Sequence, residues 1–149
     1  MIRSLIFLVL FLSLSTSAYS KMLSVKSEKV GLMSGPGKNY QIKCEYDKGF
    51  PLKVTSTKGK WVKTEDFEKD SGWILNDFLS DHPSVIVKVN KNTENKINIR
   101  IGPGDNYKIV GQAFYGVVFE KIEHKNGWVK IHHDSGLTGW VKGSFLWGY

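Results

Sequence analysis

The side chains suited to covalent chemistry are few: one cysteine, Cys44, and four histidines, His82, His124, His132 and His133. A thiol activated by an imidazole would be the nucleophile of a cysteine peptidase. Cys44 has no second cysteine with which to form a disulfide within the chain. We therefore expect Cys44 to be either buried and inert, the commoner fate of a free cysteine, or available to another molecule.

The chain offers no constellation for metal or phosphate chemistry. His132 and His133 are neighbours beside a predicted strand, where successive side chains point to opposite faces and do not easily share one metal ion. The acidic run 65–70 is more simply a solvated loop between two strands. The glycine-rich turn 102–104 precedes neither a Lys-Ser/Thr pair nor a helix, as a phosphate-binding loop would. The sequence predicts no catalytic residue, no metal and no cofactor.

An internal repeat with an offset of 67 residues organises the rest of the chain. Three strings recur: Gly-Pro-Gly-x-Asn-Tyr at 35–40 and 102–107, Trp-Val-Lys at 61–63 and 128–130, and Gly-Trp at 72–73 and 139–140. The register holds from 30 to 79 without an insertion or deletion. Neither copy is long enough for a papain-like peptidase domain, so catalysis by Cys44 is not expected.

Each copy reads as short strands separated by turns. Residues 97–101 alternate apolar and polar side chains, and Asn126-Gly127 predicts a hairpin turn before a strand at 128–131. The second copy also predicts a leading hairpin, in which 85–89 pairs with 96–99. No segment after residue 20 shows a sustained helical period. The predicted fold class is all-β, with two tandem small β-barrels.

The first 20 residues have the pattern of a secretory signal peptide. Arg3 precedes an apolar run at 5–14, and Ala18-x-Ser20 fits a cleavage site. The apolar run is shorter than the roughly 18 residues of a membrane span, so no integral membrane segment is expected after cleavage. The sequence thus predicts a signal peptide at 1–20, one domain at 21–82, a second at 83–149, and a periplasmic or secreted protein.

A family resemblance follows from the second copy. Asn98-x-Arg100-x-Gly-Pro-Gly-x-x-Tyr107 leads to Gly-Trp-Val-Lys-Ile at 127–131, Gly-Trp-Val at 139–141 and Phe-Leu at 145–146. This succession resembles the bacterial SH3 domain over the whole copy. The first copy resembles it over 35–79, but has Gly31 and Met33 in place of the motif's Asn and Arg. The resemblance implies two tandem SH3-like barrels, each five-stranded and partly open, that bind peptidoglycan, other peptides or partner proteins.

The resemblance also implies an aromatic groove in each copy, because eukaryotic SH3 relatives bind extended peptides on aromatic ridges. The groove residues would be Tyr107, Trp128 and Phe145 in the second copy, and Tyr40, Trp61 and Phe78 in the first. For Trp61 and Trp128, core packing is an equal alternative; for Trp73 and Trp140, core packing is favoured. Leu75 and Lys142 replace the proline of the eukaryotic groove, so recognition of Pro-x-x-Pro peptides is not expected.

Arg100 completes the predicted ligand-binding residues. Its guanidinium could pair with a carboxylate of a wall peptide, although a structural ion pair or a stacked position on the surface is the favoured alternative. Because the second copy keeps Asn98 and Arg100, we predict that this copy is the one that binds.

The net charge of +7 becomes +6 without the signal peptide, with +2 on the first copy and +4 on the second. This bias permits weak, salt-dependent attraction to an acidic wall polymer, and nucleic acid is not an expected partner. The sequence therefore predicts an exported, non-enzymatic module that binds a cell-wall peptide or glycan. The alternative is a periplasmic structural or adaptor protein whose exposed strand edge or C-terminal residues 147–149 bind a partner protein.

Overall fold

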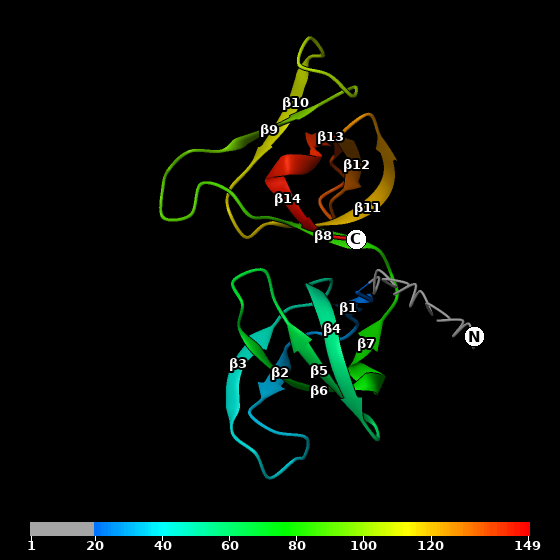
Figure 1. Cartoon of the computed structure of the whole chain (residues 1–149). Coiled ribbons are helices and arrows are strands. Elements are labelled where there is room, and N and C mark those ends of the chain that lie inside the picture. Colours follow the sequence, from blue (N-terminus) through cyan, green and yellow to red (C-terminus); the bar gives the residue numbers. More distant parts are fainter. Residues whose placement is uncertain (1–19) are drawn as a thin grey trace, which may run out of the picture.

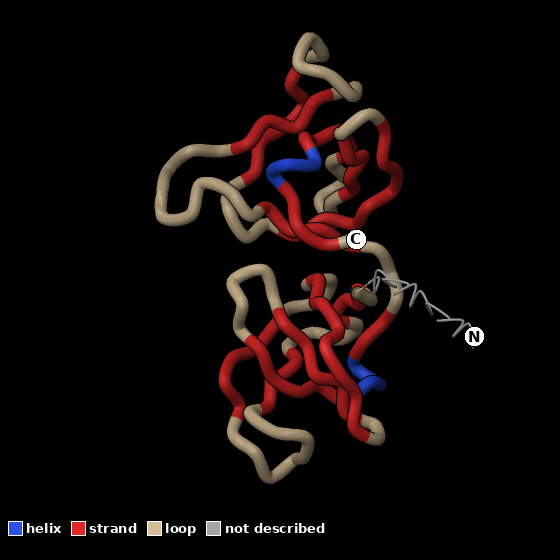
Figure 2. Tube along the Cα trace, viewed as in Figure 1, coloured by secondary structure: helices blue, strands red, loops and turns tan. Residues whose placement is uncertain are grey.

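The computed structural model describes residues 20–149 as two units, each built on one antiparallel β-sheet (Figures 1 and 2). The first sheet contains β1 (Met22–Val25), β2 (Val30–Met33), β3 (Ile42–Tyr46), β4 (Pro51–Lys58), β5 (Trp61–Glu65), β6 (Ser71–Leu75) and β7 (Leu79–Ser80). The second contains β8 (Ser84–Val87), β9 (Ile97–Arg100), β10 (Ile109–Ala113), β11 (Val118–Lys125), β12 (Trp128–His132), β13 (Thr138–Lys142) and β14 (Leu146–Gly148). Residues 1–19, and with them all but the last residue of the predicted signal peptide, lie outside the described residues.

The two sheets share one topology, β3-β2-β6-β5-β4-β1-β7 and β10-β9-β13-β12-β11-β8-β14. A short 3-10 helix precedes the last strand of each unit, η1 (Asn76–Phe78) and η2 (Gly143–Phe145). The predicted all-β fold of two tandem barrels is confirmed. Among residues 20–149, no helix has the length and apolarity that crossing a membrane would require.

Each sheet has two strands more than the five implied by the resemblance. The additional pair in the first unit is the hairpin β2–β3, which surrounds the Gly-Pro-Gly turn. This hairpin joins the barrel through one residue pair, Met33 with Trp73, and the pair Arg100–Trp140 does the same in the second unit. Each hairpin therefore has few ladder pairs with the rest of the sheet, although Leu32 of β2 and Ile99 of β9 lie in the two apolar cores.

The predicted leading hairpin of the second copy is wrong. β8 pairs with β11 and β14, whereas β9 pairs with β10 and β13. All four residues of β8 are buried, so the strand is enclosed between two neighbours. Asn90 and Asn92 take left-handed φ values of 65° and 58°. These turn-forming residues bend the connection between β8 and β9, which do not pair with each other.

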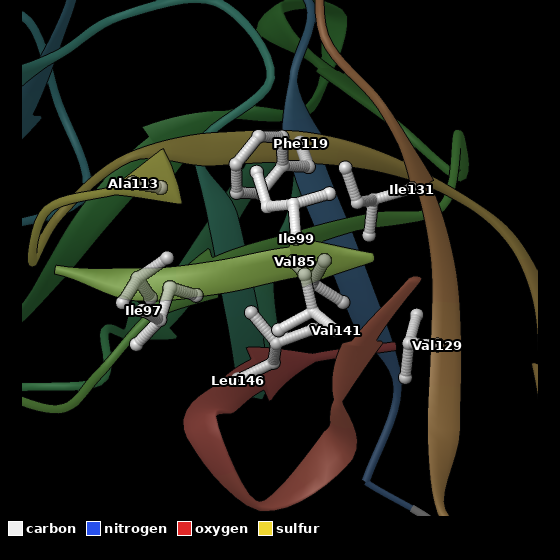
Figure 3. Packing of buried hydrophobic residues seen from close by; sticks show 10 residues of the cluster. Val85, Ile97, Ile99, Ala113, Phe119, Val129, Ile131, Val141 and Leu146 are labelled. Carbon is white, nitrogen blue, oxygen red and sulfur yellow. The ribbon is translucent and has the colours of Figure 1, made fainter. Parts of the chain in front are cut away.

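Alternation along the strands builds one apolar core in each unit. In the second unit, Ile99, Phe119, Ile131 and Val141 reach the same interior from β9, β11, β12 and β13 (Figure 3). The corresponding residues of the first unit include Leu32, Leu52, Val62 and Ile74. Side chains next to these residues point outward, and they include the tryptophans of β5, β6, β12 and β13.

Trp140 is buried, as core packing predicts, but it lies outside the apolar cluster, where Val141 takes the inward position. The Lys130 ammonium lies 6.0 Å from the centre of its ring. Trp73, its counterpart in the first unit, is only half-buried. Successive side chains of β6 and β13 point to opposite faces of the sheet, so the residue after each tryptophan points into the core and the tryptophan does not.

Cys44 is a packing residue of the first unit. It is partly buried against the apolar cluster and forms no disulfide. The matching position in the second unit is Gly111, where an added Cβ would come within 2.7 Å of Leu137. Leu137 therefore fills in the second unit the place that Cys44 fills in the first, which explains why the cysteine is not repeated.

The two units pack on each other through Phe67. Its ring centre lies 5.4 Å from that of Tyr115 and 6.4 Å from that of Trp147 in the second unit. The neighbouring Glu68 carboxylate accepts hydrogen bonds from the Tyr115 hydroxyl and the Lys91 ammonium. The C-terminal end of the chain lies between the units (Figure 1), and Trp147 is thereby part of an internal contact.

Alkaline pH should destabilise this protein. Burial and the hydrogen bond to Asp66 raise the pKa of Tyr46, burial and the hydrogen bond to Glu68 raise the pKa of Tyr115, and burial and the charge of Asp81 raise the pKa of Tyr149 to about 12. The folded protein thus holds these protons more tightly than the unfolded chain. Stability is fully present below pH 10.0, the ordinary tyrosine value, and falls as pH rises toward about 12.

Urea unfolding at several pH values above and below 10.0 measures this effect. The free energy of unfolding should fall with increasing pH, and less steeply in Tyr149→Phe than in the wild type. A free energy of unfolding that stays constant across this range would contradict the prediction.

Candidate functional site

The structure has a groove at the same place in each unit. Groove 2, of about 450 Å³, is lined in the second unit by Lys96, Asn98, Arg100, Asp105, Trp128, Lys142 and Phe145, among others. Groove 1, of about 360 Å³, is lined in the first unit by Lys29, Met33, Lys38, Ile42, Trp61, Leu75 and Phe78, among others. The 67-residue offset brings Trp128 and Phe145 onto Trp61 and Phe78.

The tryptophan of groove 2 is positioned by a tight turn. Asn126 and Gly127 take φ values of 48° and 80°, and the chain then enters β12 at Trp128. Val129 and Ile131 occupy the core, so Trp128 faces outward and is half-buried.

Phe145 is brought to groove 2 by η2. The backbone N–H of Gly143 donates to the Gly127 carbonyl at 2.8 Å, which ties the start of η2 to the hairpin turn. In the first unit, the backbone N–H of Asn76 donates to the Lys60 carbonyl at 2.9 Å in the same way. The two units therefore position their tryptophan and phenylalanine by the same local contacts.

The structure does not bring Tyr107 and Tyr40 into the grooves. An added Cβ at Gly102 would lie 2.4 Å from the Tyr107 ring, and one at Gly35 would lie 2.3 Å from the Tyr40 ring. Each tyrosine thus lies directly on the turn that precedes it. The glycines are required by this contact, and the tyrosines stabilise the turn.

Arg100 lies in groove 2, and its contact within the protein is a hydrogen bond to the backbone, not the expected ion pair. Its Nη1 donates to the Tyr107 carbonyl at 2.8 Å, which ties the Gly-Pro-Gly turn to the groove. Among the described residues, no carboxylate lies within salt-bridge distance of Arg100. A guanidinium carries five N–H donors, so this side chain can hold the turn and still contact a ligand.

Lys142 and Asp105 form a polar cap at Trp128. The Lys142 Nζ lies 2.8 Å from the Asp105 Oδ2 and 5.7 Å from the centre of the Trp128 ring. Lys142 is the cross-strand partner of Trp128, so the two side chains share one face of the sheet. Groove 2 therefore combines an aromatic surface with cations.

Groove 1 is more apolar than groove 2. Met33, Lys38 and Leu75 stand where groove 2 has Arg100, Asp105 and Lys142. Phe78 and Ile42 are 42% and 59% exposed, which leaves an apolar surface beside Trp61. The sequence already shows Met33 in place of the arginine and Leu75 in place of Lys142, but it does not show the apolar surface that these residues leave in groove 1.

The histidines lie mostly near a cleft between the units. His82 Nε2 lies 3.2 Å from Glu120 Oε1, His132 Nδ1 contacts the Thr138 hydroxyl, and His133 Nδ1 contacts the Ser135 hydroxyl. His132 and His133 thus have separate partners, in agreement with their expected opposite directions. Within residues 20–149, no group of three His, Cys, Asp or Glu side chains is placed to hold a metal ion.

Two family profiles match the chain, and both are described as bacterial SH3 domain. One matches residues 95–146 and the other residues 26–81. A curated protein named "Putative N-acetylmuramoyl-L-alanine amidase YrvJ", from Bacillus subtilis strain 168, is 27% identical over 154 residues. The match covers 95% of this chain and 30% of that protein, so the chain spans less than a third of its curated relative.

Two solved structures are similar at low sequence identity. A NlpC/P60 family protein from Bacillus cereus ATCC 10987 has a TM-score of 0.37 and 12% identity, over 86% of this chain and 56% of that chain. NlpC1 from Trichomonas vaginalis has a TM-score of 0.38 and 12% identity, over 90% of this chain and 48% of that chain.

Proposed function

Because the chain belongs to the bacterial SH3 domain family, with two copies in tandem, we propose that it is a non-enzymatic module of the cell envelope that binds peptidoglycan. The observation that carries the proposal is groove 2, where Trp128 and Phe145 are surrounded by Lys96, Arg100 and Lys142. Aromatic surfaces bind extended chains, and the cations complement the carboxylates of a wall peptide.

The relative's name supports the placement in the envelope. An N-acetylmuramoyl-L-alanine amidase acts on a bond between the glycan and the peptide of the wall, and this chain matches 30% of that protein. The signal-peptide pattern of residues 1–20 points to the same compartment. The proposal assigns no bond-breaking step to this chain, and Cys44 has a packing role.

Trp128→Ala should reduce retention on purified peptidoglycan about tenfold, because a central aromatic residue carries much of the binding energy of such a surface. The measurement is the fraction of protein that sediments with peptidoglycan at low and at high salt. Trp61→Ala is the matched control at the same position of groove 1, and its retention should equal that of the wild type. Retention of Trp128→Ala at the wild-type level would contradict the proposal.

A second candidate function is the binding of a partner protein through groove 1. The observation that favours it is the exposed apolar surface of Ile42 and Phe78 beside Trp61. The same pair of variants separates the two functions. Co-purification of an envelope protein that is lost in Trp61→Ala and kept in Trp128→Ala would favour the adaptor function.

A further inference from the structure

We propose that groove 2 binds a peptide through its carboxylate, which Lys142 and Arg100 receive, and that Asp105 competes with this carboxylate for Lys142. The inference deepens the proposed function and rests on it, because it gives the chemistry of the ligand that groove 2 would take.

In the structure the Asp105 carboxylate already occupies the place beside Lys142 that a ligand carboxylate would take. The Nζ–Oδ2 distance of 2.8 Å is that of a charge-assisted hydrogen bond. The pair sits against Trp128, whose ring centre is 5.7 Å from the same ammonium. A ligand carboxylate in the place of Asp105 would keep the charge contact, and the rest of the peptide would lie along the aromatic surface.

The two members of the pair differ in how firmly they are held. Lys142 ends β13 and is paired with Trp128 across the sheet, and its side chain is 38% exposed. Asp105 lies on the Gly-Pro-Gly turn, outside any strand, and its side chain is 62% exposed. An exposed ion pair contributes little to stability, so a ligand can displace Asp105 at a small cost.

Arg100 supplies the second cation. Its Nη1 is held by the Tyr107 carbonyl, which orients the guanidinium on the wall of groove 2. It lies within salt-bridge distance of no carboxylate in residues 20–149. With Lys96, groove 2 presents three cations against the one carboxylate of Asp105, so it favours an anionic ligand.

The first unit is an internal control for this site. At the three equivalent positions it has Met33, Lys38 and Leu75, so it has neither the receiving cations nor the competing carboxylate. The site is therefore a property of the second unit and not of the repeated fold.

The experiment uses the dipeptide N-acetyl-Ala-Ala with a free C-terminal carboxylate, and the same dipeptide as its C-terminal amide. Binding is followed by NMR through the indole N–H resonance of Trp128, with that of Trp61 as the reference. The acid should shift the Trp128 resonance and the amide should not. Asp105→Asn should tighten binding of the acid about two- to fivefold, and Lys142→Met should weaken it about tenfold. Lys38→Asn, at the position equivalent to Asp105, should leave the affinity unchanged.

Equal shifts with acid and amide, or an affinity for the acid that Asp105→Asn leaves unchanged or lowers, would overturn the carboxylate site. Its failure can be told from failure of the proposed function. If the protein is retained on peptidoglycan but the acid does not shift the Trp128 resonance, only the carboxylate site is overturned. A carboxylate-dependent shift without retention on peptidoglycan supports the site and overturns the proposed function.

Discussion

Asp66→Ala should lower the free energy of unfolding by about 3 kcal/mol, because it removes an acceptor from three donors in a buried place. Asp66 is only 5% exposed. Its Oδ2 accepts from the Tyr46 hydroxyl at 2.8 Å, and its Oδ1 accepts from the backbone N–H groups of Glu68 and Asp70 at 2.9 and 3.0 Å. Without Asp66, the buried Tyr46 hydroxyl loses its partner and the loop after β5 loses its anchor.

The network belongs to the first unit alone. The positions that match Tyr46 and Asp66 in the second unit are Ala113 and His133, and the His133 ring lies 5.7 Å from the Phe119 ring in a T-shaped arrangement. Phe119, which stands in place of Leu52, lies in the same apolar cluster as Ala113. The two cores are therefore packed with different residues. The second unit has no equivalent of the Asp66 hydrogen bonds, so the loss on replacing Asp66 is confined to the first unit.

Asp66→Asn is the conservative variant for this test. Its side-chain oxygen can still accept from the loop N–H groups, and its amide can donate to the Tyr46 oxygen. Urea unfolding should therefore give it less than half of the loss seen with Asp66→Ala. A change below about 0.5 kcal/mol for Asp66→Ala would mean that the carboxylate does not anchor the loop.

Phe67→Ala should change the unfolding of this protein from one cooperative transition to two. Phe67 lies in the first unit, where it also packs 6.0 Å from the ring centre of Phe50, and it contacts Tyr115 and Trp147 in the second unit. Replacing a half-buried phenylalanine by alanine lowers the free energy of unfolding by about 3 kcal/mol. Units of about 60 residues are marginal alone, so this loss is large enough to uncouple them.

Differential scanning calorimetry measures the coupling, through the ratio of the calorimetric to the van't Hoff enthalpy. The matched control is Asp134→Ala, because residue 134 is the equivalent of Phe67 in the second unit and is exposed. This control should keep the single transition of the wild type. A single transition in Phe67→Ala, displaced only in temperature, would show that other contacts couple the units.

The strand position of the groove tryptophan could be predicted from the sequence because it depends on local turn chemistry: Asn126-Gly127 predicts a hairpin turn, and Trp128 begins the next strand. The sequence left open whether Trp128 faces the core or the groove, and the structure decides this because Val129 and Ile131 take the core positions. The offset of 67 residues then transfers this geometry to Trp61. The resemblance to SH3 domains also predicts Tyr107 and Tyr40 in the grooves. This prediction is wrong, because each tyrosine packs on a glycine of its own turn.

By itself the sequence determined the duplication and the all-β class, because periodicity and turn chemistry act over a few residues. The partners of β8, the Lys142–Asp105 cap of groove 2 and the Phe67 contact between the units were decided only by the tertiary structure. Each of these depends on residues far apart in the chain that meet when the barrels close and pack. No local sequence pattern distinguishes these contacting residues from other residues of the same types that do not come into contact.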